Sequence, residues 1–150
     1  MKNLMHRKPF AMLLTFLSAM VILSACEKES VVPEGKLPDD AQGFISLHFP
    51  DQSISQVIKD RDGLSVDYEV ILENGVQLEF NRKGECSSIE GNTELPDSVI
   101  PEKILEYVNQ SYADNFIISW ERDDNEQEVM IDNGTELKFD KSSNFLRIDY

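Results

Sequence analysis

The most chemically specific residue of the sequence is Cys26, because it closes a segment organised like a lipoprotein signal peptide. A basic stretch with three Lys and Arg residues at positions 2–8 precedes an apolar run from Phe10 to Leu23. This run is shorter than the roughly 20 residues that a membrane-spanning helix needs. Two small residues, Ser24 and Ala25, then lead to the cysteine. Small side chains fit the cleft of a signal peptidase, and the thiol can accept a diacylglyceryl group.

We therefore predict that residues 1–25 are removed and that Cys26 carries a lipid anchor to the membrane. Each buried CH₂ of an acyl chain contributes about 0.8 kcal/mol, so two or three chains hold a protein stably. The predicted location is the cell envelope, with the outer membrane favoured and a periplasmic or surface-facing domain. The alternative is an ordinary secretory signal followed by a chance cysteine.

The mature chain is strongly acidic. Removing the leader takes away three basic and no acidic residues, so 11 Lys and Arg remain against 28 Asp and Glu, a formal charge of −17. Such a charge repels nucleic acids and anionic lipids, which argues against both as partners. It permits a basic partner surface or divalent cations, although solubility in a crowded envelope explains it as well.

Elsewhere the sequence offers few groups for catalysis or metal binding. Cys86 and His48 are the single remaining cysteine and histidine, so an intramolecular disulfide is excluded and a nucleophile–base pair or a zinc site is not indicated. Asp60-Arg61-Asp62-Gly63 and Asp123-Asp124-Asn125 lack the ligand spacing of a calcium loop and are typical of turns. We predict no enzyme activity, no metal and no cofactor.

The mature chain divides into a tether and one domain. Residues 26–36 contain Pro33 and Gly35 and show no apolar periodicity, which predicts a flexible tether. From residue 37 the chain repeats itself. Leu37-Pro38-Asp39 recurs as Leu95-Pro96-Asp97, and residues 68–75 recur 59 positions later as residues 127–134. We interpret residues 37–150 as one domain with repeats at 37–91 and 95–150.

Each repeat predicts one helix followed by four strands. In the first, Asp39 can cap a helix over residues 40–48, and in the second Pro101 suits a first helical turn. Alternating apolar residues then flank Asn74-Gly75 and Asn133-Gly134, which predict hairpins with type I′ turns. The predicted fold is α+β, with two tandem αββββ repeats whose helices pack on one face of a curved antiparallel sheet.

The residues of the first repeat also resemble a known family. The resemblance to the PepSY-like domain of Bacteroidetes envelope lipoproteins is carried by Leu37-Pro38, Phe44-Ile45, His48-Phe49-Pro50, Tyr68-Glu69-Val70, Asn74-Gly75, Leu78-Glu79-Phe80 and Gly84-Glu85. That family often has a tryptophan where this chain has Cys86, and the second repeat has Ser142-Ser143 in place of Gly84. The resemblance implies a fold similar to the β-lactamase inhibitor protein, and binding or inhibition of an envelope protein by analogy.

The remaining candidate for a functional site is the open face of the sheet. Aligned 59 positions apart, the strand that contains Trp120 matches Lys59 and Arg61 in the first repeat, which suggests that this phase faces solvent. The partner-binding candidates on this interpretation are Trp120, Met130, Ile71, Phe116 and Ile118. In the alternative phase, Trp120 belongs to the core.

Two functions follow from these observations. The first is a lipid-anchored envelope module that binds, and inhibits or regulates, an envelope protein through its open sheet. The second is a structural or stress-related envelope lipoprotein with no specific partner. The acidic charge and the scarcity of catalytic groups fit both.

Overall fold

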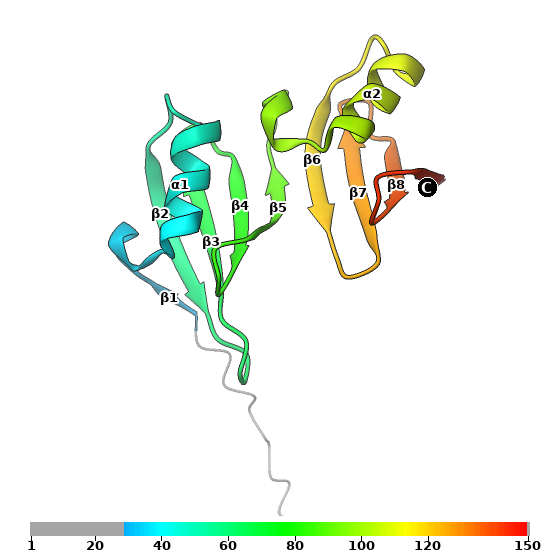
Figure 1. Ribbon diagram of the computed structural model, residues 1–150. Coiled ribbons are helices and arrows are strands. Elements are labelled where there is room, and N and C mark those ends of the chain that lie inside the picture. The colour runs from blue at the N-terminus through cyan, green and yellow to red at the C-terminus, as the bar shows by residue number, and fades with distance from the viewer. Residues whose placement is uncertain (1–28, 150) are drawn as a thin grey trace, which may run out of the picture.

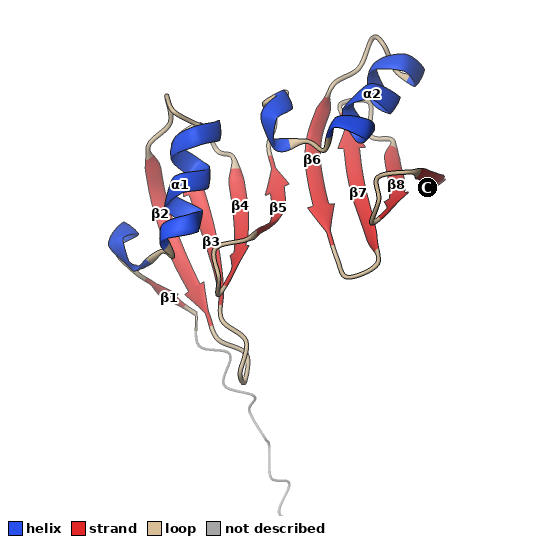
Figure 2. Ribbon diagram, viewed as in Figure 1, coloured by secondary structure: helices blue, strands red, loops and turns tan. Residues whose placement is uncertain are grey.

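The computed structural model describes residues 29–149, in which nine antiparallel strands form one open sheet in the order of the sequence. Figure 1 shows both α-helices in front of this sheet, and Figure 2 separates helices from strands by colour. The strands are β1 (Ser30–Val31), β2 (Ile54–Asp60), β3 (Asp67–Leu72), β4 (Gln77–Asn81), β5 (Cys86–Glu90), β6 (Ile117–Arg122), β7 (Glu126–Ile131), β8 (Glu136–Asp140) and β9 (Phe145–Asp149). The helices are α1 (Asp39–His48) and α2 (Glu102–Ser111), each preceded by a 3₁₀ turn, η1 (Glu34–Lys36) and η2 (Asp97–Val99).

One row of side chains explains why the helices cover a single face. Cross-strand pairing joins one residue from each strand, β2 to β9, into a continuous line: Val57, Val70, Leu78, Ile89, Trp120, Val129, Leu137 and Ile148. All but the last are buried. Buried side chains of α1 and α2 belong to the same hydrophobic core. Burying each large apolar side chain contributes roughly 1.5–3 kcal/mol, so this row fixes the register of the sheet.

Both α-helices begin after a proline. Pro38 precedes α1 and Pro101 precedes α2, and neither helix has a side-chain cap. The predicted capping by Asp39 is therefore wrong, as is the first-turn place of Pro101. Asp39 is instead the first helical residue, where its charge complements the positive end of the helix dipole.

The hairpin turns also differ from the type I′ prediction. A type I′ turn needs a positive φ at two central residues, whereas in each of these turns it is the glycine, Gly75 or Gly134, that has one, at 85° or 83°. The Gly75 N–H donates to the Leu72 carbonyl, and Leu72 in turn donates to Val76. The loops therefore have three residues, with glycine in the left-handed position that closes the turn.

The tether prediction is wrong for residues 30–36. Ser30 and Val31 pair with Lys59 and Ile58 of β2, and the Val32 N–H donates to the Val57 carbonyl at 2.9 Å. The 3₁₀ turn η1 follows directly. The backbone groups at the edge of β2 attract this segment because an unpaired strand edge offers free hydrogen-bonding groups. The predicted cleavage site and Cys26 lie outside the described residues.

The elements from η1 to β5 and from η2 to β9 follow in the same order, but the predicted alignment is partly wrong. Leu37-Pro38-Asp39 leads into α1, whereas Leu95-Pro96-Asp97 leads into η2. Corresponding bounds of α1 and α2 are 63 residues apart, while those of β3 and β7 are 59 apart. The change of offset falls between the first two long strands, where β2 and β3 are joined by a longer loop than β6 and β7. That the two halves are copies of one unit stays a prediction.

Candidate binding face

The face of the sheet opposite the helices carries mainly charged side chains. Its central row, one residue per strand from β2 to β9, is Ile58, Glu69, Glu79, Ser88, Glu121, Glu128, Lys138 and Arg147. A second row runs beside it through Gln56, Ile71, Gln77, Glu90, Ser119, Met130, Glu136 and Asp149. The hairpins place these residues, because alternate side chains along a strand point to opposite faces.

Between β3 and β6 this face is negative. We define the acidic patch as Asp67, Glu69, Glu79, Glu90 and Glu121. Glu69 and Glu79 lie directly opposite each other on β3 and β4, an arrangement that destabilises a sheet. Among the described residues, no ion pair involves any member of the patch.

Glu79 shows the effect of this crowding on ionisation. Its pKa is raised from the usual value, first because neighbouring groups remove part of its water, and then because Glu121, Glu69, Asp67 and Glu90 repel its charge. Both causes disfavour the ionised carboxylate. The patch therefore holds its negative charges under mutual repulsion, which a positively charged ligand would relieve.

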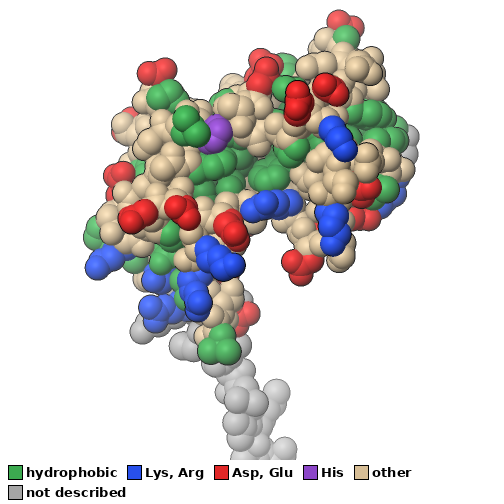
Figure 3. Space-filling view, viewed as in Figure 1, with side chains coloured by type: hydrophobic (Ala, Val, Ile, Leu, Met, Phe, Trp, Pro, Cys, Tyr) green, Lys and Arg blue, Asp and Glu red, His purple; other side chains and the backbone are tan. Residues whose placement is uncertain are grey.

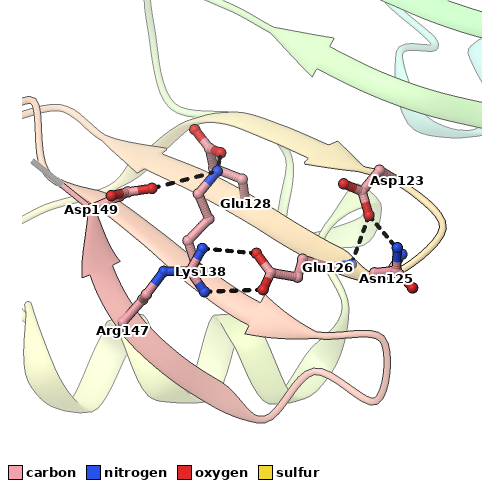
Figure 4. A network of polar contacts seen from close by, with 7 residues as sticks. All are labelled: Asp123, Asn125, Glu126, Glu128, Lys138, Arg147 and Asp149. Atoms are coloured by element: carbon pink, nitrogen blue, oxygen red, sulfur yellow. Dashed lines mark hydrogen bonds and ion pairs between the residues drawn. The ribbon is translucent and has the colours of Figure 1, made fainter.

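The same face is partly neutralised between β7 and β9 by two basic residues, Lys138 and Arg147, as Figure 4 shows. Lys138 forms ion pairs with Glu128 and with Asp149, the second at 4.0 Å. The two terminal nitrogens of Arg147 donate to the two carboxylate oxygens of Glu126, both at 3.0 Å. The hydrogen bond from Arg147 lowers the pKa of Glu126. These two basic residues therefore stabilise the ionised carboxylates beside them.

A hollow of about 350 Å³ opens at the β2 and β3 end of the acidic patch. It is lined by Glu29, Ile58, Asp60, Asp67, Tyr68, Glu69 and Glu79. The Oδ1 atom of Asp60 is buried and has no hydrogen-bond partner among the described residues. A buried acceptor without a hydrogen-bond donor is unfavourable, so this end of the face carries an unsatisfied carboxylate oxygen as well as unpaired negative charge.

The predicted exposure of Trp120 on this face is wrong. Trp120 is 6% exposed and pairs with Ile89 and Val129 in the core row. Its indole N–H donates to the Gln127 side-chain oxygen at 3.2 Å, and the Arg122 guanidinium lies 5.8 Å from the ring centre. These contacts make Trp120 part of the core that supports the face.

A wrong alignment of the two halves, together with a β-bulge, explains the error. The pairing with β7 shifts between Ile117 and Ser119, so Ile117 and Trp120 both face the core although they are three residues apart. Simple alternation, which the prediction used, places them on opposite faces. In the structure the counterpart of Trp120 is the buried Val57, and not Arg61.

The other candidates do not form one apolar patch. Ile71 and Met130 lie on the second row of the open face, half-buried, but β4, β5 and β6 separate them. Ile118 is the extra residue of the bulge, next to Ser119. Phe116 is half-buried before β6, where its N–H and carbonyl bond to Asp132. The acidic patch was not among the predicted sites. Glutamates at alternate positions of the hairpin strands were the sequence pattern that could have indicated it.

Two groups that could do chemistry have structural surroundings. Burial raises the pKa of the Cys86 thiol to about 12, so the reactive thiolate is scarce at neutral pH. His48 contacts the Ser98 hydroxyl at 2.9 Å through Nδ1, and burial lowers its pKa. Among residues 29–149, no three His, Cys, Asp or Glu side chains are placed to hold a metal ion. No helix in this part of the chain is long and apolar enough to cross a membrane.

The helix side of the molecule differs from the open face. Figure 3 looks onto this side and shows Asp and Glu together with Lys and Arg, and hydrophobic side chains between the two helices. No ion pair joins a basic residue of the described chain to the acidic patch on the other side of the sheet.

Comparisons with known proteins agree with this fold. Residues 66–147 match the model of a family described as "Putative beta-lactamase-inhibitor-like, PepSY-like". Among the curated proteins, none matches the chain.

This chain matches three solved structures over nearly their whole length. A "putative periplasmic protein" of the DUF2874 family from Bacteroides vulgatus is 35% identical, with a TM-score of 0.78, and the match covers 82% of this chain and 98% of that one. A "putative calcium-regulated periplasmic protein" from Bacteroides thetaiotaomicron is 36% identical, with a TM-score of 0.78 and coverage of 81% and 97%. A second Bacteroides vulgatus protein, described as periplasmic and of unknown function, is 30% identical, with a TM-score of 0.77 and coverage of 82% and 100%.

Proposed function

Because the chain belongs to the PepSY-like family, whose solved relatives are periplasmic proteins, we propose that it is a lipid-anchored binding module of the cell envelope. In this proposal Cys26 carries the lipid, and the open face of the sheet binds another envelope protein. Inhibition or regulation of that protein is the expected consequence, by analogy with the inhibitor-like family description.

The observation that carries the proposal is the acidic patch on an uncovered sheet face. A fold selected for stability alone avoids like charges directly opposite each other on neighbouring strands. Here Glu69 faces Glu79, and Glu121 lies on the same row. Binding sites commonly keep such unfavourable arrangements, because the ligand supplies what the free protein lacks.

The location and the repeat are finer parts of the same proposal. The relatives support a cell-envelope location, and the signal-peptide pattern before Cys26 supports lipid anchoring. The common element order of the two halves supports their origin as copies of one αββββ unit. Cys26→Ser should release the protein from the membrane fraction of cells, whereas a variant that stays there would contradict the anchor.

The second candidate function is an envelope lipoprotein without a specific partner. It is favoured by the ion pairs of Lys138 and Arg147, which show that part of the open face is already satisfied within the chain. One relative is described as calcium-regulated, but the described residues contain no cluster that could hold a metal ion. We therefore treat calcium as a competitor to be tested and not as the ligand.

Photo-crosslinking in cells tests the proposal. The reactive residue replaces Gln77, an exposed and uncharged residue of the open face between Ile71 and Glu90. The control replaces Glu106, which is exposed on α2. A discrete crosslinked band at position 77 alone is the expected result. Bands at neither position, with the protein correctly lipidated, would favour the partner-free function, and a band at position 106 alone would move the site to the helix side.

A further inference from the structure

Charge on the open face identifies the kind of partner. Resting on the function proposed above, we infer that the acidic patch binds a basic segment of a partner protein, whose Lys or Arg side chains lie across strands β3 to β6. The patch consists of the five carboxylates Asp67, Glu69, Glu79, Glu90 and Glu121, defined above.

The register of the sheet leaves space for a basic side chain at the centre of the patch. Ser88 occupies the central row between Glu79 on β4 and Glu121 on β6. Neighbouring strands are about 4.8 Å apart, so the two glutamates stand on strands about 10 Å apart with a small side chain between them. A Lys or Arg placed over Ser88 would have a carboxylate on each side.

The other half of the same face shows how such a side chain is held. Lys138 lies on the central row between β7 and β9 and pairs with Glu128 on one side and Asp149 on the other. Strands β3 to β6 present carboxylates on the same two rows but contribute no Lys or Arg to these rows. The partner would therefore supply basic side chains to the acidic patch, as Lys138 of β8 and Arg147 of β9 do for the carboxylates near them.

The hollow at the β2 edge gives independent support. The buried Asp60 Oδ1 lacks a hydrogen-bond donor among the described residues, and Asp60 lines the hollow together with Asp67 and Glu69. Lysine offers three N–H donors and arginine five, so a basic side chain in the hollow could donate to two of the carboxylates that line it. The raised pKa of Glu79 agrees, because its causes, first burial and then repulsion by the acidic neighbours, both disfavour the ionised carboxylate that a nearby cation would stabilise.

A basic segment fits the patch better than a metal ion does. Calcium needs six to eight oxygens converging at roughly 2.3–2.6 Å, whereas these carboxylates are spread over four strands. No group of three among the described residues converges in that way. Nucleic acid and anionic membranes are repelled by the same charges.

The test uses the lipidated protein in nonionic detergent and a short peptide that alternates arginine and serine, with binding followed by calorimetry. Glu69→Gln/Glu79→Gln should weaken binding of the peptide about tenfold, because each lost charge pair at a partly exposed site contributes a few-fold. The matched control is Glu73→Gln/Glu106→Gln, which removes the same net charge from exposed positions outside the patch. This control should change the affinity less than twofold.

Three outcomes would overturn the inference. Equal losses in the two double variants would show that only net charge matters. Displacement of the peptide by calcium at an equimolar concentration would indicate a cation site. A peptide that does not bind the wild-type protein at all would exclude basic recognition.

Two further readouts separate this inference from folding and from the proposed function. The unfolding midpoint of Glu69→Gln/Glu79→Gln should be equal to or above that of the wild type, so misfolding cannot explain weaker binding. If the crosslink from position 77 persists unchanged in that variant, the partner docks through other contacts. In that case this inference fails while the proposed function stands, whereas a wild-type chain without the crosslink would contradict the function itself.

Discussion

The two halves of the sheet, β2 to β5 and β6 to β9, present similar rows of positions but balance charge in different ways. In the C-terminal half, Lys138 and Arg147 pair with the carboxylates beside them. In the N-terminal half, Glu69 and Glu79 face each other, and no ion pair within the described residues relieves them.

The two halves share a core that stabilises the fold, but they differ in the charge of the open face. The C-terminal half shows that the scaffold can accommodate basic residues on its open face, so nothing in the architecture forces the N-terminal half to remain acidic. The core rows of the two halves join into one line, and both halves bury apolar side chains beneath the helices. Under the function proposed above, the unrelieved charge serves binding, and the predictions below test the contrast between the two halves.

The largest expected effect concerns the core row, where Trp120 in one half corresponds to Val57 in the other. Trp120→Ala should lower the free energy of unfolding by about 4 kcal/mol and Val57→Ala by about 2 kcal/mol, because the indole leaves the larger cavity. Denaturant unfolding measures both. A Trp120→Ala variant as stable as the wild type would return Trp120 to the surface and restore it as a partner-binding candidate.

Trp120 also shows what the sequence could and could not predict. The hairpins, the helix order and the open sheet follow from alternation and turn residues such as Asn74-Gly75, because these signals are local. The bulge at Ile118 depends on how β6 pairs with β7, and β2 has the equivalent irregularity between Ile54 and Gln56. Strict alternation along a strand predicts neither. An insertion between β2 and β3 changes the offset between the two halves, so the alignment matched Trp120 with Arg61 instead of Val57.

Part of the acidic patch could have been predicted from the sequence, but its full extent depends on how the strands pair. Alternation alone places Glu69 and Glu79 on the open face. That Ser88 and Glu121 continue their row depends on the contact between β5 and β6, which joins the two halves. The segment at residues 30–36 was mispredicted for the same reason, since its order comes from pairing with β2.

The second prediction compares two equivalent turns. Gly84 has a φ of 87°, and an added Cβ would lie 2.7 Å from the Ala41 backbone nitrogen. Gly84→Ala should therefore lower the free energy of unfolding by about 3 kcal/mol through backbone strain and the clash with α1. In the other half Ser143 already has a φ of 63°, and its hydroxyl bonds to Gln127 at 3.0 Å.

Ser143→Gly provides the control for this prediction. The glycine relieves the backbone but removes the hydroxyl contact, so its stability should stay within about 1 kcal/mol of the wild type. Thermal unfolding of the two variants checks the pair. Equal effects at the two positions would show that close packing against α1 does not distinguish the turns.

The third prediction removes a counter-charge from the partly neutralised C-terminal half. Lys138→Met should lower the free energy of unfolding by about 1 kcal/mol, because Glu128 and Asp149 lose the basic residue they share at a half-buried site. Lys141→Met, at an exposed turn position, is the matched control and should have no measurable effect. Urea unfolding at low salt makes the difference clearest, and similar losses in both variants would argue against the ion-pair network.

The smallest expected effect has the opposite sign and lies in the acidic patch. Glu79→Gln should raise the free energy of unfolding at neutral pH by about 0.5 kcal/mol, because it removes like-charge repulsion with Glu69 and Glu121 at an exposed site. The equivalent change at Glu73, in the exposed hairpin turn, should leave stability unchanged. A destabilised Glu79→Gln variant would show that this carboxylate stabilises the fold, which would contradict the repulsion assigned to it.

The pH dependence sharpens the same contrast. Since the pKa of Glu79 is raised in the folded protein, the folded state holds this proton more tightly than the unfolded chain does. The repulsion from Glu79 is therefore fully present above its folded pKa and disappears as the pH falls to the ordinary glutamate value. Glu126 behaves in the opposite way, since its lowered pKa gives stability that is lost as the pH falls through that lower value. Unfolding measured across the mildly acidic range should show the stability difference between Glu79→Gln and the wild type shrinking as the pH falls, and a constant difference would contradict the assignment of repulsion to Glu79.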